Sequence, residues 1–199
     1  MFAYGEMPML EVIAIIAIVL AIAIAAVLIL AAAKPDTLSV ERVIGIRAPP
    51  QTIFPLINDF HRWRSWSPYE DRDPALKRSY SGAESGKGAV YAWESNRNVG
   101  SGRMEILRSS EPAAIVIKLD FFKPFEGHNI AEFTMLPQGD STRLTWMMHG
   151  PAPLMSRVMQ VFMDMDRMIG RDFEAGLANL KALSENETMG SPVTQPNAD

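Results

Sequence analysis

The stretch that decides the fold runs from Leu154 to Leu183 and has the sequence LMSRVMQVFMDMDRMIGRDFEAGLANLKAL. Pro151 and Pro153 precede it and no further proline follows until Pro192, which is the start and stop pattern of a long helix. At 100° per residue its apolar side chains share one stripe, formed by Met155, Val158, Phe162, Met165, Ile169, Phe173, Leu180 and Leu183. Such a stripe must be buried against a matching surface. We therefore predict one long C-terminal helix at the centre of the fold.

Three residues of this helix depart from the apolar pattern. Asp166 lies at the edge of the stripe, where a carboxylate needs a partner or solvent. Two interpretations are open: Asp166 pairs with an arginine from the sheet, or it is a polar group in a cavity wall. Gly170 and Gly176 each cost about 1 kcal/mol relative to alanine inside a helix, so we expect close packing at both positions.

The N-terminal segment is apolar without interruption. Residues 12–33 are drawn only from Ala, Ile, Leu and Val, and about 20 such residues cross a hydrocarbon core. A secretory signal peptide is the alternative, but it has a positive N-terminal region and a shorter apolar core. Residues 1–11 carry Glu6 and Glu11 and no Lys or Arg. We predict a short N-terminal tail over 1–11 and a single transmembrane helix over 12–33.

The charges beside this helix predict its orientation. No basic residue precedes it, whereas Lys34, Arg42 and Arg47 follow it. Because positive residues favour the cytoplasmic side of a membrane helix, we expect a single-pass protein of the cell membrane with its C-terminal domain in the cytoplasm.

Composition limits the function of the remaining chain. Residues 37–185 are enough for one hydrophobic core. They hold equal numbers of acidic and basic residues and no basic run, so we expect no nucleic-acid partner. The chain has no cysteine and therefore no disulfide framework. Residues 186–199 are polar and contain Gly190, Pro192 and Pro196, which predicts a disordered tail.

Short strands separate the two helical regions. Leu38–Ile46 is the first, and Pro49-Pro50 begins a short helix that ends at Asn58. Six further strands are expected at Leu76–Tyr80, Ala89–Glu94, Arg103–Arg108, Ala113–Asp120, His128–Leu136 and Thr142–His149. No helical stretch lies among them, so an antiparallel meander is predicted. Alternation places on its inner face Tyr91, Trp93, Met104, Ile106, Ile115, Ile117, Leu119, Ala131, Phe133, Met135, Leu144, Trp146 and Met148.

The segment from His61 to Tyr69 holds three large aromatic residues, Trp63, Trp66 and Tyr69. This segment is either a plug that closes one end of the core, or a pocket mouth or membrane-interface belt, where amphipathic rings and arginines are common.

Residues that carry chemistry are sparse. His61, His128 and His149 are far apart in the sequence, and no spacing typical of a metal site is present. No Gly-x-Ser-x-Gly elbow exists for a nucleophilic serine. We predict no catalytic residue, no metal and no cofactor.

The order of one strand, two short helices, a six-strand meander and a long helix is the helix-grip arrangement. The chain resembles the START-like (SRPBCC) superfamily, in its polyketide cyclase/dehydrase-like branch. The resemblance covers about Ser39 to Leu183 and is carried by Arg47-Ala-Pro-Pro50, Asn58–Pro68, Gly100–Arg103, Thr145–Gly150, Phe162–Asp166 and Gly170–Phe173. It implies an α+β fold, START/Bet v 1-like, whose antiparallel sheet curls around the C-terminal helix and leaves an apolar cavity, here preceded by one transmembrane helix.

Two classes of function follow from this resemblance. The first is a membrane-anchored domain that binds a hydrophobic small molecule or lipid. The residues expected to bind the ligand are Trp93, Phe133, Trp146, Met148, Met159, Phe162 and Asp166. The alternative is a polyketide cyclase/dehydratase-like enzyme that uses Asp166, Tyr91 and an arginine. A third possibility is a partner-binding domain with a filled core.

Overall fold

The computed structural model describes residues 8–95 and 99–190. The chain forms two compact units. One contains the chain up to residue 36 together with residues 152–164, and the other contains residues 37–151 and the chain from residue 165 onward. Each unit is described by itself.

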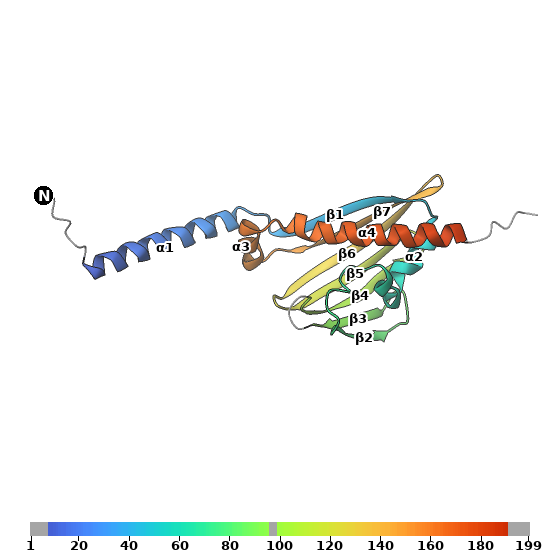
Figure 1. Ribbon diagram of the computed structural model, residues 1–199, viewed down its shortest axis with the longest axis horizontal. Helices are drawn as coiled ribbons and strands as arrows, with labels where there is room; N and C mark the ends of the chain where they lie inside the picture. The colour runs from blue at the N-terminus through green and yellow to red at the C-terminus, as the bar shows by residue number, and fades with distance from the viewer. Residues whose placement is uncertain (1–7, 96–98, 191–199) are drawn as a thin grey trace, which may run out of the picture. The chain divides into compact units, whose positions relative to one another are not determined.

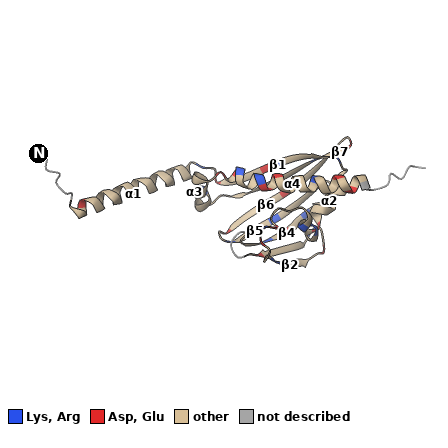
Figure 2. Ribbon diagram, in the orientation of Figure 1, with Lys and Arg blue, Asp and Glu red and all other residues tan. Residues whose placement is uncertain are grey.

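The first unit consists of two helices, α1 (Met9–Ala32) and α3 (Leu154–Phe162). They contact each other near the C-terminal end of α1 (Figure 1). By length and composition α1 is able to cross a membrane. In Figure 2 the ribbon of α1 carries the colour of a charged residue only at its N-terminal end, and Glu11 lies in this first turn.

The second unit is built on a seven-stranded antiparallel sheet with the order β1-β7-β6-β5-β4-β3-β2 (Figure 1). Its strands are β1 (Thr37–Ile46), β2 (Lys77–Gly82), β3 (Ala89–Glu94), β4 (Ser101–Ser110), β5 (Ala114–Lys123), β6 (Gly127–Gln138) and β7 (Ser141–Pro151). Strands β2 to β7 pair in sequence order, which confirms the predicted meander, and β1 closes the order by pairing with β7.

The long helix α4 (Met165–Gly190) packs on this sheet and confirms the α+β helix-grip fold. Its buried apolar side chains are Phe173, Leu177 and Leu180. The predicted inner face of the sheet is buried throughout, except that Leu119 is only half-buried. The alternation of strands and the apolar stripe of the helix therefore locate the core from the sequence.

One predicted element is wrong. The helix expected from Leu154 to Leu183 is two helices, since Met163 has extended backbone angles (φ −133°, ψ 134°) and α4 begins at Met165. Asp164 directly precedes the new helix, at a position that favours aspartate as a cap, and Asp166 in the first turn suits the positive end of the helix dipole. The sequence thus contained a second helix start inside the run.

The ends of the helices also differ from the expected ranges. Helix α4 includes residues 186–190, which the sequence assigned to a disordered tail. Residues 191–199 and most of the predicted N-terminal tail lie outside the described residues.

The aromatic segment forms the predicted plug. After α2 (Pro50–Asn58), the 3-10 helix η1 (Phe60–Ser65) places Trp63 and Trp66 in the core. Their indole N–H groups donate to the backbone oxygens of Ile57 and Leu56, both at 2.9 Å. Two large rings are thereby buried with their polar atoms satisfied.

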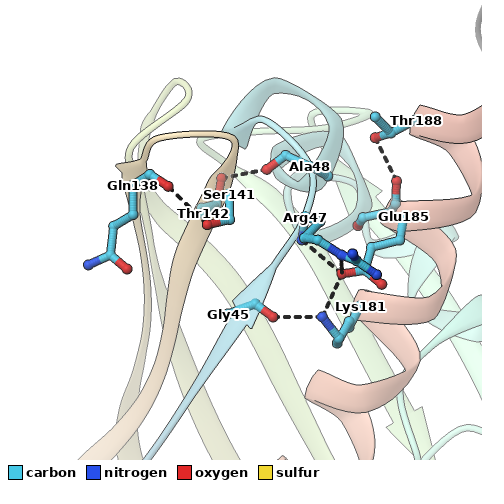
Figure 3. Close-up of polar contacts among 10 residues, drawn as sticks. Gly45, Arg47, Ala48, Gln138, Ser141, Thr142, Lys181, Glu185 and Thr188 are labelled. Carbon is cyan, nitrogen blue, oxygen red and sulfur yellow. Dashed lines mark hydrogen bonds and ion pairs between the residues drawn. The ribbon is translucent and has the colours of Figure 1, made fainter.

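Polar contacts join the end of β1 to α4 (Figure 3). The Glu185 carboxylate accepts the backbone N–H of Arg47 at 2.8 Å and pairs with Lys181. Lys181 in turn donates to the backbone oxygen of Gly45 at 2.9 Å. The hydrogen bonds from Lys181 and from the Arg47 backbone hold the pKa of Glu185 below its usual value.

This contact predicts a pH dependence. A lowered folded-state pKa stabilises the fold above the unfolded pKa of glutamate, about 4.3, and that stabilisation is lost as the pH falls. Glu185→Gln should therefore melt below the wild type at about pH 7 and approach it near pH 3. Thermal melts of both proteins at the two pH values test this. An equal difference at both values would contradict it.

Close packing explains both glycines of α4. A Cβ at Gly176 would lie 2.9 Å from the Trp146 ring and 3.2 Å from Pro68, and one at Gly170 would meet the Arg42 guanidinium. The packing expected at these positions is confirmed.

We expect Gly176→Ala to lower the free energy of unfolding. Overpacking costs about 1–3 kcal/mol, and the better helix propensity of alanine returns about 1 kcal/mol. Urea unfolding measures the balance. Ala178→Gly at an exposed position of α4 is the matched control for propensity alone. A Gly176→Ala protein more stable than wild type would show that Trp146 does not restrict this position.

Candidate functional site

The candidate site lies between the sheet and α4, where aromatic side chains from β6, β7 and α4 contact one another. Trp93, Phe133, Trp146 and Met148, four of the predicted ligand-binding residues, are all buried there. The Phe133 and Trp146 ring centroids are 4.9 Å apart. Trp146 also stacks on Phe173 of α4, at 3.9 Å and an interplanar angle of 7°. All four belong to one buried hydrophobic cluster. Trp93, however, lies on β3, which two strands separate from β6, and its ring contacts those of Tyr91 and Phe121.

Trp66 completes this group of rings from the segment after η1. Its centroid lies 5.7 Å from that of Trp146 and 6.2 Å from that of Phe133. Asn179 of α4 donates to the Trp66 backbone oxygen at 2.9 Å. In this structure, therefore, the rings contact one another between sheet and helix, and a ligand that binds there must separate them.

Trp146 carries an unused polar atom. Its residue is 3% exposed, and its Nε1 has no hydrogen-bond partner among the described residues. The other three tryptophans donate to backbone oxygens of Ile57, Leu56 and Val99. A buried donor without an acceptor is costly, and an acceptor atom of a bound molecule would remove that cost.

A buried polar network lies beside the rings, on the β2 and β3 side of the inner face. The Tyr91 hydroxyl donates to Glu70 Oε1 at 2.7 Å, and Arg78 Nε donates to Glu70 Oε2 at 2.6 Å. Arg78 also donates to the Glu70 backbone oxygen at 2.8 Å. Both carboxylate oxygens are thus occupied, and the segment that carries Glu70 is fixed to the sheet.

The electrostatics of this network keep the tyrosine neutral. Burial, followed by the hydrogen bond to Glu70, raises the pKa of Tyr91 far above its ordinary value. Burial and the Glu70 charge raise the pKa of the neighbouring Tyr80 as well. Tyr91 is therefore a hydrogen-bond donor, and its proton is directed to Glu70.

Sequence reasoning missed Glu70. It lies in a polar segment without hydrophobic periodicity, between Pro68 and Leu76. Only the folded chain shows that this side chain is buried and paired. A glutamate two residues after a proline gives no local signal of burial.

Asp166 is not in a cavity wall. Its carboxylate forms a bidentate pair with Arg42 of β1, at 3.0 and 3.1 Å, and its side chain is 59% exposed. Arg42 also pairs with Glu174 at 2.8 Å. The hydrogen bonds from Arg42 lower the pKa of Asp166. This matches the interpretation that an arginine of the sheet pairs with Asp166.

Met159 and Phe162 do not belong to the unit that holds the candidate site. Both belong to α3 in the first compact unit, because the helix break at Met163 separates them from α4. Phe162 is 71% exposed. Their place in a ligand site remains a prediction, whereas Trp93, Phe133, Trp146 and Met148 all belong to the second unit.

Comparison with protein families gives one match. The model of the family described as "Polyketide cyclase / dehydrase and lipid transport" matches residues 37–185. A search of the curated proteins finds no match.

Solved structures share the fold at low sequence identity. A protein of Chromobacterium violaceum is 16% identical, with a TM-score of 0.53 over 76% of this chain and 99% of its own. The di-domain aromatase/cyclase StfQ of the steffimycin biosynthetic pathway is 10% identical, with a TM-score of 0.56 over 77% of this chain and 52% of its own. The Aha1 dimer of Colwellia psychrerythraea is 14% identical, with a TM-score of 0.52 over 74% and 96%. At these identities the likeness shows the fold alone.

Proposed function

Because the chain belongs to the polyketide cyclase/dehydrase and lipid transport family, we propose that residues 37–185 bind a hydrophobic small molecule or lipid between the sheet and α4. The observation that carries this proposal is the apolar surface around Trp146, with its buried and unpartnered indole N–H. Ligand sites are typically apolar with a few placed polar groups, and this surface has that composition.

The surface predicts the chemistry of the ligand. An apolar body would contact Trp93, Phe133 and Met148, and a carbonyl, ether or hydroxyl oxygen would accept the Trp146 N–H. Because Trp66 and Phe173 contact Trp146 in this structure, binding requires these rings to move apart. The segment after Trp66 is the element whose displacement would open the surface.

The enzymatic alternative has weaker support. This alternative needs Asp166, Tyr91 and an arginine to act together. Tyr91 is linked through Glu70 to Arg78, whereas Asp166 pairs with a different arginine, Arg42. General acid–base catalysis needs a group within hydrogen-bond reach of the substrate. Here Tyr91 and both oxygens of Glu70 already bond to each other or to Arg78, which favours a structural role for the network.

We further propose that α1 anchors the domain in the cell membrane, with the domain in the cytoplasm. The length and composition of α1 support the span, and Lys34, Arg42 and Arg47 after it support the orientation. The chain has no native cysteine, so Glu84→Cys, at an exposed position of the β2–β3 turn, gives a single thiol. It should resist a membrane-impermeant reagent in intact cells. Labelling without lysis would reverse the orientation.

Displacement of a fluorescent fatty-acid probe tests ligand binding. The full chain in detergent should bind the probe, and Trp146→Phe should weaken binding by about 5- to 10-fold, as expected for one neutral hydrogen bond. Asp166→Asn is the control and should bind as the wild type does, since Asp166 is exposed and paired with Arg42. Failure of the wild type to bind any apolar probe would exclude the proposed function.

A further inference from the structure

Helix α3 exposes its apolar side. At 100° per residue Met155 and Phe162 share one face, with Val158 and Met159 beside them. Met155 is 60% exposed and Phe162 71% exposed. A helix on the surface of a globular domain normally turns this face toward the core.

The polar residues of α3 are no more exposed than its apolar residues Val158, Met159 and Val161, which are also half-buried. Ser156, Arg157 and Gln160 lie on the opposite face and are half-buried, and the Nε atom of Arg157 is fully buried. The exposed residues of α3 are Leu154, Met155 and Phe162, all of them apolar, which is not the pattern expected in water. Exposed apolar surface of this kind marks an interaction with another apolar phase.

The position of α3 relative to α1 identifies that phase. The two helices contact each other within one compact unit, and the Ala152 N–H donates to the Asp36 oxygen at 2.6 Å. In α1 only Ala31 is buried and Val27 half-buried, so the covered part of α1 is its C-terminal end. Helix α3 thus lies beside the last turns of α1 (Figure 1), and under the proposed anchoring these turns lie where hydrocarbon gives way to headgroups.

We propose that α3 is an interfacial helix whose Met155–Phe162 face inserts into the bilayer surface beside α1. Amphipathic helices with large apolar side chains bind lipid in this way, with the helix axis in the interface and the apolar face buried about 5–10 Å. The inference rests on the proposed anchoring by α1. The proposal also gives a function to the helix break at Met163. Because of this break, α3 is able to bind lipid while α4 packs on the sheet.

Spin labels on single cysteines test the proposal in phosphatidylcholine liposomes that contain the full chain. We expect a label at Phe162→Cys to collide readily with oxygen and poorly with a water-soluble nickel complex. A label at the control Glu84→Cys, at an exposed position of the β2–β3 turn, should show a several-fold higher ratio of nickel to oxygen collisions. Met155→Cys is a second site on the apolar face, should Phe162→Cys disturb folding.

A third label separates the two proposals. Leu20→Cys, in the middle of α1, should lie in the hydrocarbon. If Leu20 is shielded from nickel while Phe162 and Met155 are accessible to it, α1 spans the membrane and the interfacial role of α3 is wrong. If the labels at Phe162 and Glu84 are equally accessible to nickel, or if the Phe162 label is shielded from oxygen and nickel alike, α3 is not interfacial. If Leu20 itself is accessible to nickel, the anchor fails, and the inference about α3 fails with it.

Discussion

Replacement of Glu70 by leucine should lower the free energy of unfolding by about 3–5 kcal/mol, the cost of removing one partner from a buried ion pair. Glu70 is buried, and its carboxylate accepts hydrogen bonds from Arg78 and Tyr91. Its loss would leave the Arg78 guanidinium, only 19% exposed, without its carboxylate. Urea unfolding of the full chain in detergent can be followed by tryptophan fluorescence, because all four tryptophans lie in the second compact unit.

The double variant Glu70→Leu/Arg78→Leu is the control for this prediction. Replacement of a whole buried pair by apolar residues is often neutral, so the double variant should recover much of the stability lost in Glu70→Leu. Glu70→Gln should lie between Glu70→Leu and wild type, since an amide still accepts hydrogen bonds. Additive losses in the double variant would show that Glu70 and Arg78 act independently.

The second large effect is expected for Trp66→Ala. Trp66 is 1% exposed and contacts three further rings, those of Trp63, Phe133 and Trp146. Truncation of a buried tryptophan costs about 3–5 kcal/mol through lost burial and the cavity left behind. Urea unfolding measures the loss.

Two variants limit the interpretation of this result. Trp66→Phe keeps most of the ring volume but leaves the Leu56 oxygen without its donor, which should cost about 1–3 kcal/mol. Phe122→Ala removes an exposed ring of β5 and should change stability by less than about 0.5 kcal/mol. A Trp66→Ala protein as stable as Phe122→Ala would mean that the plug contributes nothing to the core.

The strands and the second half of the long helix were predictable because each has a regular period. Alternation placed Phe133, Trp146 and Met148 on the inner face, and Phe173 and Leu180 follow the helical stripe. The break at Met163 was missed because the apolar spacing continues across it. A stripe shows that a face is apolar but does not show whether protein or lipid covers it. Under our proposal for α3, this difference separates α4 from α3.

The candidate site was predictable only where it lies on regular strands. Trp146 and Phe133 were found from alternation, whereas Glu70 and Trp66 lie on irregular segments whose burial depends on tertiary contacts. Asp166 was assigned to the site from its place on the helix, but its carboxylate is at the exposed edge, where Arg42 reaches it from β1. A charged side chain at the edge of a stripe has many possible partners, and the sequence alone does not predict which of them it pairs with.

Native mass spectrometry of the full chain, released from cell membranes in mild detergent, tests the central claim most directly. We expect the wild type to retain an apolar molecule with an oxygen acceptor, and Trp146→Phe to retain much less of it. Because both proteins carry the same α1, lipid bound around the anchor is common to them and cancels in the comparison. A folded wild type that carries no more apolar ligand than Trp146→Phe would contradict ligand binding between the sheet and α4.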